Sequence, residues 1–114
     1  MQRKDHRLLT ETELAGLQMA LPEWKRVGAF LECWQGFPSF PLAMEFVRRV
    51  AEVAEELDHH PDIDIRYRKV CVRLTTYSAG GLTSLDVEAA GRISALLSEA
   101  GKGLPSPSSA LHEP

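Results

Sequence analysis

The segment from Leu42 to Leu57 carries the clearest periodic pattern of the sequence and constrains the fold more than any other feature. Apolar residues recur there at every third or fourth position, and the charged residues lie mostly away from them. The apolar stripe consists of Leu42, Phe46, Val50, Ala54 and Leu57, widened by Met44, Val47, Ala51 and Val53. This spacing predicts an amphipathic helix of about four turns. The helix should stop near Asp58, because Pro61 prevents its continuation.

Two pairs of strands are predicted on either side of this helix. After it, Ile63, Ile65 and Tyr67 alternate with charged residues, which is typical of a half-buried strand. Apolar Val70, Val72 and Leu74 alternate with the other residues of 69–75 and predict a second strand. Before it, residues 23–28 and 30–35 are predicted strands. Gly28-Ala29 between them favours a hairpin turn, and the proline- and glycine-containing residues 36–41 favour a loop.

Helices are also predicted near both ends of the chain. Thr10 and Glu13 form the capping-box pattern at the start of a short helix, which should end before Pro22. Thr83 is the expected N-cap of a last helix, with Asp86 in its first turn, where an acid favours the positive end of the helix dipole. The expected buried face of this helix is Val87, Ala90, Ile93, Leu96 and Leu97.

The order of these elements predicts an α+β fold, with a four-stranded antiparallel sheet and three helices packed on one face. We expect a single domain over residues 1–100. Residues 101–114 are small, polar and rich in proline, so a disordered tail is predicted there. Four strands leave two open sheet edges, which suggests self-association through sheet extension.

Composition argues against several classes of function. The net charge is −3 and no block of lysine and arginine occurs, so direct nucleic-acid binding is not expected. No apolar run could span a bilayer, and no apolar stretch follows the charged first residues, so a cytoplasmic protein is expected. Cys33 and Cys71 lack metal-site or redox spacing and are expected to be buried thiols.

The adjacent histidines His59 and His60 are the strongest candidates for chemistry. Histidine titrates near neutral pH and can act as an acid or a base. Glu55 lies four residues before His59, on the same helix face if the last turn extends that far, and a nearby carboxylate can fix the tautomer of a histidine. Spacing alone favours a simpler interpretation, in which the histidines cap the helix C-terminus. A zinc site is weakly indicated, because no third ligand stands at motif spacing.

A longer series of residues changes this balance. It runs Glu55-x3-His59-His60-Pro61, Tyr67, Thr75-Thr76-Tyr77, Gly80-Gly81-Leu82-Thr83 and Asp86, with Phe46-Val47-x2-Val50-Ala51 before it and Ala89-Ala90-x2-Ile93 after it. The series resembles the pterin-4a-carbinolamine dehydratase family. The resemblance covers roughly residues 10–97, and its most specific part is 55–86.

The resemblance implies the same α+β fold, assembled as dimers or dimers of dimers, and the activity of a 4a-hydroxytetrahydrobiopterin dehydratase, a hydro-lyase. Such an enzyme removes water from a 4a-hydroxytetrahydropterin, gives the quinonoid dihydropterin and needs no metal or bound cofactor. By the same resemblance, Glu55 would orient the first histidine, and His59 and His60 would be acid and base groups. The implied pterin contacts are Asp58, Thr75, Thr76, Ser78 and Asp86.

Tyr77 departs from the family pattern, which has a histidine or sometimes a tryptophan there. A tyrosine with an ordinary pKa of about 10 can donate a hydrogen bond but is a poor base at neutral pH. Two functions therefore stand beside each other. One is an active dehydratase in which Tyr77 takes the third catalytic position. The other is an interaction protein on the same fold, such as a dimerisation coactivator or a Rubisco assembly factor of carboxysomes.

Overall fold

A computed structural model describes residues 6–103 of the chain, with side chains described up to residue 99. The predicted order of helices and strands is confirmed. The elements are α1 (Glu11–Ala20), β1 (Lys25–Val27), β2 (Phe30–Gly36), α2 (Phe40–Leu57), β3 (Asp62–Arg66), β4 (Lys69–Leu74), the short 3-10 helix η2 (Tyr77–Ala79) and α3 (Ser84–Gly103).

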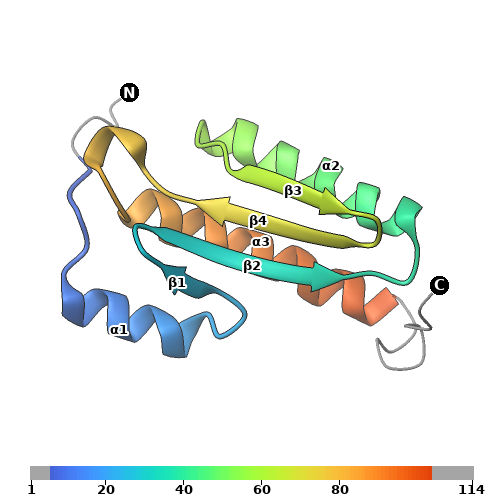
Figure 1. Cartoon of the computed structure of the whole chain (residues 1–114), viewed down its shortest axis with the longest axis horizontal. Coiled ribbons are helices and arrows are strands. Elements are labelled where there is room, and N and C mark those ends of the chain that lie inside the picture. Colours follow the sequence, from blue (N-terminus) through green and yellow to red (C-terminus); the bar gives the residue numbers. More distant parts are fainter. Residues whose placement is uncertain (1–5, 104–114) are drawn as a thin grey trace.

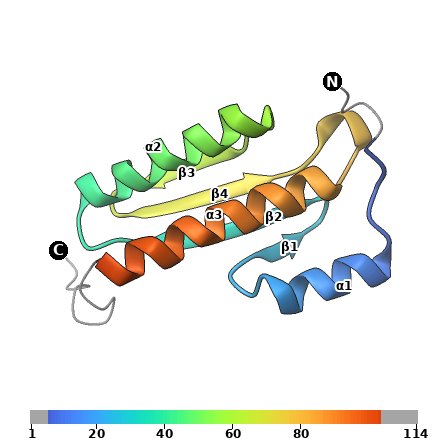
Figure 2. The same cartoon turned by 180° about the vertical axis from the view of Figure 1, so that it is seen from behind.

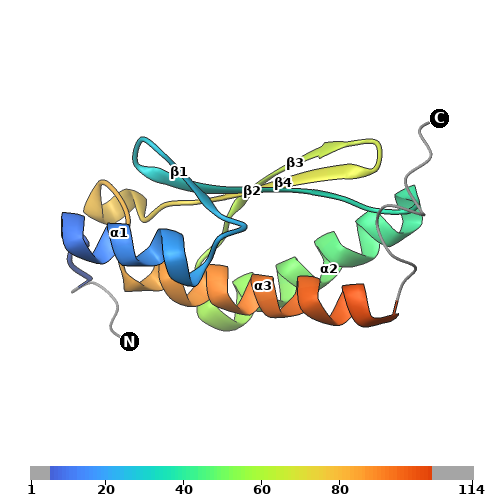
Figure 3. The same cartoon turned by 90° about the horizontal axis from the view of Figure 1, so that it is seen from below.

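The four strands form one antiparallel sheet in the order β1-β2-β4-β3. Seen edge-on, the sheet forms one layer and α1, α2 and α3 lie together on one side of it (Figure 3). From behind, α2 and α3 run side by side across the sheet, and α1 lies beyond β1 at its edge (Figure 2). The predicted fold class, an α+β protein with three helices on one face, is confirmed.

The core lies between the sheet and the pair α2 and α3. Alternate residues of the two central strands point toward the helices and are buried, which is the expected consequence of strand pleating. The sheet contributes Leu31, Cys33, Val70, Val72 and Leu74, and the helices contribute Ala43, Phe46, Val50, Ala89, Ala90 and Ile93. This packing fixes how the C-terminal end of α2 sits relative to the N-terminal end of α3.

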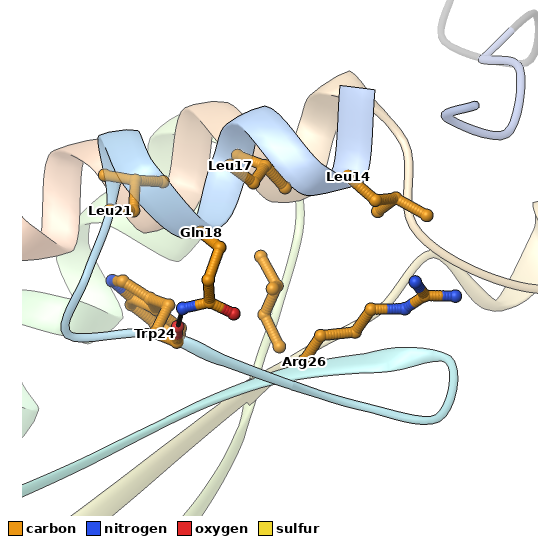
Figure 4. A pocket seen from close by; sticks show the side chains of 7 residues that line it. Leu14, Leu17, Gln18, Leu21, Trp24 and Arg26 are labelled. Carbon is orange, nitrogen blue, oxygen red and sulfur yellow. Dashed lines mark hydrogen bonds between the residues drawn. The ribbon is translucent and has the colours of Figure 1, made fainter. Parts of the chain in front are cut away.

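Helix α1 covers the β1 end of the sheet more loosely. Its capping box is present as predicted: Glu13 N–H donates to the Thr10 hydroxyl, and the Glu13 carboxylate accepts from Thr10 N–H. Leu14, Leu17 and Leu21 of this helix line a small pocket together with Gln18 and Trp24 (Figure 4). The cavity has a volume of only about 10 Å³. Gln18 donates to the Trp24 carbonyl at 2.8 Å, and the Trp24 indole N–H donates to Ser94 on α3 at 2.9 Å.

Some predicted boundaries were wrong. Strand β1 is only three residues long, whereas residues 23–28 were predicted. Helix α2 begins at Phe40 and has 18 residues, about five turns, because a proline at Pro41 is tolerated in a first turn whose N–H groups have no helical partner. Helix α3 runs to Gly103, and residues 104–114 of the predicted tail lie outside the described residues, so the tail stays a prediction. Within residues 6–103, no helix is long and apolar enough to cross a membrane.

Candidate active site

The predicted site residues gather at one end of the sheet. Helix α2 ends there, β3 starts, β4 ends, and α3 begins after the η2 turn, so the ends of four elements meet (Figure 1).

Asp58 sets the direction in which the histidines leave α2. It caps the helix in the left-handed conformation, with φ 52° and ψ 44°, and its N–H donates to the carbonyls of Ala54 and Glu55. The N–H of His59 also donates to the Ala54 carbonyl, at 3.0 Å. A left-handed non-glycine residue is uncommon because its Cβ crowds the backbone. The chain therefore leaves the helix at Asp58, and the two histidines lie outside the helical repeat.

His59 pairs with the buried acid Asp86. His59 Nε2 lies 2.7 Å from Asp86 Oδ1; the histidine side chain is 11% exposed and that of Asp86 is fully buried. The other carboxylate oxygen, Oδ2, accepts from the hydroxyl of Thr76 at 2.7 Å and from the N–H of Thr83 at 2.9 Å. All three partners therefore act as donors to one carboxylate, which is the arrangement that makes a buried charge tolerable.

The hydrogen bonds among Thr83, Thr76 and Asp86 have a defined direction. The N–H of Leu85 donates to the Thr83 hydroxyl at 3.2 Å, as expected for the predicted N-cap of α3. The Thr83 hydroxyl lies 2.8 Å from that of Thr76, which itself donates to Asp86. Since a carboxylate only accepts, the protons point along this chain toward Asp86. His59 then donates from Nε2, and its Nδ1 is the nitrogen left for a ligand.

His60 pairs with Glu55 at the surface. His60 Nε2 lies 2.6 Å from Glu55 Oε2, and the side chains are 56% and 76% exposed. The expectation that Glu55 orients the first histidine was therefore wrong. That expectation assumed a continuous helical repeat, whereas the left-handed Asp58 breaks the repeat and brings the second histidine to Glu55.

Tyr77 lies on η2 with 71% of its surface exposed. Its hydroxyl donates to Asp62 Oδ2 at 3.2 Å, and its ring meets that of Phe30 edge-on at 6.1 Å between centroids. The pKa of Tyr77 is raised above its usual value, first by desolvation and then by the charge and hydrogen bond of Asp62, with Arg73 acting in the opposite direction. Tyr77 is therefore held in its protonated form.

The other predicted contacts divide into two groups. Thr76 joins the Asp86 network, whereas the Thr75 hydroxyl donates to the Ala29 carbonyl at 2.6 Å and ties the end of β4 to the β1–β2 turn. Ser78 is exposed on the η2 turn. The sequence did not predict the contact of Thr83 with Asp86 or that of Asp62 with Tyr77. The helix-capping pattern at Thr83 was the only sequence signal that pointed to the Thr83 contact.

Two hollows lie away from these pairs. One is the small cavity under α1 (Figure 4). The other has a volume of about 260 Å³ and lies between the segment before α1, the β1–β2 turn and the glycine pair before α3; its lining includes Leu8, Arg26, Ala29 and Gly81. Neither is lined by a predicted site residue. Among the described residues, no group of three or more histidine, cysteine, aspartate and glutamate side chains is placed to hold a metal ion.

Comparison with known sequences identifies the family of this chain. Residues 7–96 match the family model described as pterin 4 alpha carbinolamine dehydratase. A protein of Mycolicibacterium smegmatis is 51% identical over 79 residues, covering 69% of this chain and 84% of its own. A protein of Thermomicrobium roseum is 46% identical over 90 residues, covering 79% and 97%. The names of both place them among the pterin-4-alpha-carbinolamine dehydratases.

Solved structures show the same fold. A transcriptional coactivator/pterin dehydratase from Brucella melitensis superimposes with a TM-score of 0.76 and 35% identity, over 79% of this chain and 98% of its own. A pterin dehydratase-like protein identified as a RuBisCO assembly factor in the alpha-carboxysome superimposes with a TM-score of 0.53 and 18% identity, over 84% and 95%, which shows the fold alone. The match over most of the chain shows that this protein belongs to the pterin-4a-carbinolamine dehydratase family.

Proposed function

We propose that this protein dehydrates a 4a-hydroxytetrahydropterin to the quinonoid dihydropterin. The observation that carries the proposal is the pairing of two adjacent histidines with two different carboxylates, His59 with Asp86 and His60 with Glu55, at one end of the sheet. Family membership supports the substrate class. Paired imidazole and carboxylate groups are suited to moving protons near neutral pH.

The reaction needs two proton movements. The C4a–O bond breaks as an acid protonates the leaving hydroxyl, which departs as water. A base takes the proton of N5, and the electrons of that N–H bond form the C4a=N5 double bond. No electrons are gained or lost overall, so the protein has to supply only an acid, a base and a place for the ring.

We assign the acid to His59 and the base to His60. The buried carboxylate of Asp86 holds His59 in a fixed orientation at the site, whereas the exposed His60 lies where it can exchange a proton with water. General acid–base catalysis of this kind contributes about 10²–10⁴-fold. Asp58, Thr75, Thr76 and Ser78 stay proposed pterin contacts. Thr75 and Thr76 would contribute through their main chains, because their hydroxyls donate to Ala29 and Asp86. Asp86 was also a predicted contact, but its side chain is fully buried, so it would act through His59.

The decay of 4a-hydroxytetrahydropterin, generated by an aromatic amino acid hydroxylase and followed by its absorbance, tests the proposal. Folded protein should accelerate the decay above the spontaneous rate, and H59A and H60A should each remove most of the acceleration. No acceleration by folded protein would reject catalysis. In the cell the activity would return the cofactor of such hydroxylases; the cytoplasmic location stays a prediction.

Tyr77 favours a second candidate function, a protein-binding role with little or no turnover. The position carries a tyrosine where the family usually has a histidine or a tryptophan, and the same fold serves a RuBisCO assembly factor. The deciding experiment is calorimetry with a stable dihydropterin together with the turnover assay. Absence of both binding and turnover favours the second candidate, whereas micromolar binding with turnover excludes it as the main role.

We also propose that the protein self-associates, as a homodimer or a dimer of dimers. Strands β1 and β3 each pair on one side only among the described residues, and each carries a partly exposed apolar residue, Val27 and Ile65. Open edges of this kind pair readily with another chain. Light scattering coupled to gel filtration should give a multiple of 12.7 kDa, and a mass that stays at 12.7 kDa at all concentrations would contradict the proposal.

A further inference from the structure

We infer that Asp62 is a positioning residue, which holds the Tyr77 hydroxyl so that its oxygen faces the bound pterin as a hydrogen-bond acceptor. The inference rests on the proposed function, because it assigns a part in the pterin site to Asp62, a residue outside the set predicted from the sequence. It also assigns to Tyr77 a mode of action different from that of a histidine.

Tyr77 is linked to the His59–Asp86 pair through its neighbour Thr76 and to strand β3 through Asp62. Its preceding residue, Thr76, donates to the carboxylate that holds His59, and its own hydroxyl donates to Asp62, two residues after His60. The side chain of Tyr77 is therefore fixed at its tip by β3, while its main chain is fixed next to the buried pair. This places the tyrosine at the edge of the histidine site.

The charges around Asp62 leave its carboxylate available to Tyr77. Arg73 is its cross-strand partner on β4, yet the Arg73 side chain is 3.1 Å from Glu32 on β2 and lies over the Phe30 ring at 4.7 Å. The Phe30 ring also supports the edge of Tyr77. The Tyr77 ring thus packs against Phe30, which is itself covered by the Arg73 guanidinium, and the Tyr77 hydroxyl is oriented by Asp62.

The hydrogen bond from Tyr77 to Asp62 determines whether the Tyr77 hydroxyl can donate to a ligand or only accept from it. A phenol has a single proton, and when that proton is donated to Asp62 the oxygen can only accept from a second partner. The 4a-hydroxyl of the substrate is a donor of the required kind. The raised pKa of Tyr77 agrees with this role, since the phenol stays protonated at neutral pH and cannot take a proton as a base. Tyr77 therefore positions the leaving hydroxyl and transfers no proton.

A titration tests the Asp62–Tyr77 contact without any need for turnover. The chain has two tyrosines, so Y67F leaves Tyr77 as the only one, and tyrosinate absorbance then reports its pKa. In this background D62N should lower the pKa of Tyr77, because the carboxylate charge is removed. D64N is the matched control, since Asp64 lies on the same strand and pairs with Arg66 instead. An equal effect of D62N and D64N would overturn the inference.

A double-mutant cycle tests the effect on substrate. Loss of one oriented hydrogen bond should raise KM by about 3- to 10-fold in Y77F and in D62A, with little change in kcat. D62A should have no further effect in the Y77F background, because Asp62 acts only through that hydroxyl. D62N should retain most of the affinity, since its amide oxygen still accepts from Tyr77. Additive effects of D62A and Y77F would overturn the inference.

The two experiments separate this inference from the proposed function. If the unmodified protein neither binds nor converts a pterin, the proposed function fails and the substrate part of the inference fails with it. If turnover is intact but the titration shows no specific effect of D62N, the inference alone fails.

Discussion

The fully buried carboxylate of Asp86 lies 2.7 Å from Nε2 of His59 and connects the first turn of α3 to the residue that leaves α2. The same carboxylate accepts from Thr76 and from the N–H of Thr83. One side chain thus orients a proposed acid and also completes the cap of a helix. Changes at this position are expected to affect stability and activity by different amounts.

D86N should separate the two roles of this carboxylate. The amide oxygen can still accept from Thr76 and Thr83, but the amide N–H₂ would face His59 Nε2 and force the other tautomer, with the proton on Nδ1. Turnover should fall by about 10²–10⁴-fold, while the free energy of unfolding falls by about 1–3 kcal/mol. Urea unfolding and the turnover assay measure the two effects.

E88Q is the control for this change, because Glu88 is an exposed acid of the same helix. It should leave both quantities nearly unchanged. Wild-type turnover in folded D86N protein would contradict the proposed orientation of His59.

The two histidines should differ in their contribution to stability. H59A leaves the buried Asp86 carboxylate with an unpaired oxygen and should lower the free energy of unfolding by about 1–3 kcal/mol. H60A removes a side-chain contact whose members are mostly exposed, and should lower it by about 0.2–1 kcal/mol. Urea midpoints of the two variants check this order, and a larger loss in H60A would show that the buried pair is misplaced.

The protein should be more stable with glycine than with alanine at position 58. Both substitutions remove the same side-chain interactions, but only alanine retains the cost of a left-handed Cβ, so D58G should exceed D58A by about 1 kcal/mol in unfolding free energy. At Asp64, in the middle of β3, the order should reverse, because glycine weakens a strand. Thermal unfolding of the four variants provides the comparison; equal stability of D58G and D58A would argue against the left-handed cap.

The two cysteines should be unreactive in the folded protein. Burial raises the pKa of Cys33 to about 12 and also raises that of Cys71. At pH 8 the reactive thiolate of Cys33 would be about 10⁻⁴ of the total. A thiol reagent at pH 8 should therefore label neither cysteine in native protein and both in urea; rapid labelling of native protein would contradict the burial.

The same shift predicts a pH dependence of stability. Above pH 9 the unfolded chain loses its thiol protons while the folded chain keeps them, so the unfolded state binds fewer protons and stability falls as the pH rises. Urea midpoints measured from pH 8 to pH 11 should decrease. The midpoint of C33A should fall less steeply with pH than that of the unmodified chain.

Several features of the site could not be predicted along the chain. The left-handed conformation of Asp58 carried no sequence signal, since glycine or asparagine is the usual marker of such a cap. The predicted partner of Glu55, His59, was therefore wrong by one residue, because Glu55 pairs with His60. The direction of the Tyr77 side chain was also not predictable, because it depends on Asp62 and Phe30, which lie on strands that meet η2 only in the folded chain.

The order of the elements, the helix caps at Thr10 and Thr83, most of the buried face of α2 and the family could be predicted along the chain. These depend on interactions within a few residues, or on a residue pattern that the family shares. Which carboxylate pairs with which histidine depends instead on how distant segments pack in the folded chain. His59 and Asp86 are 27 residues apart, and their contact exists because α2 and α3 pack side by side on one sheet and bring the end of one helix to the start of the other.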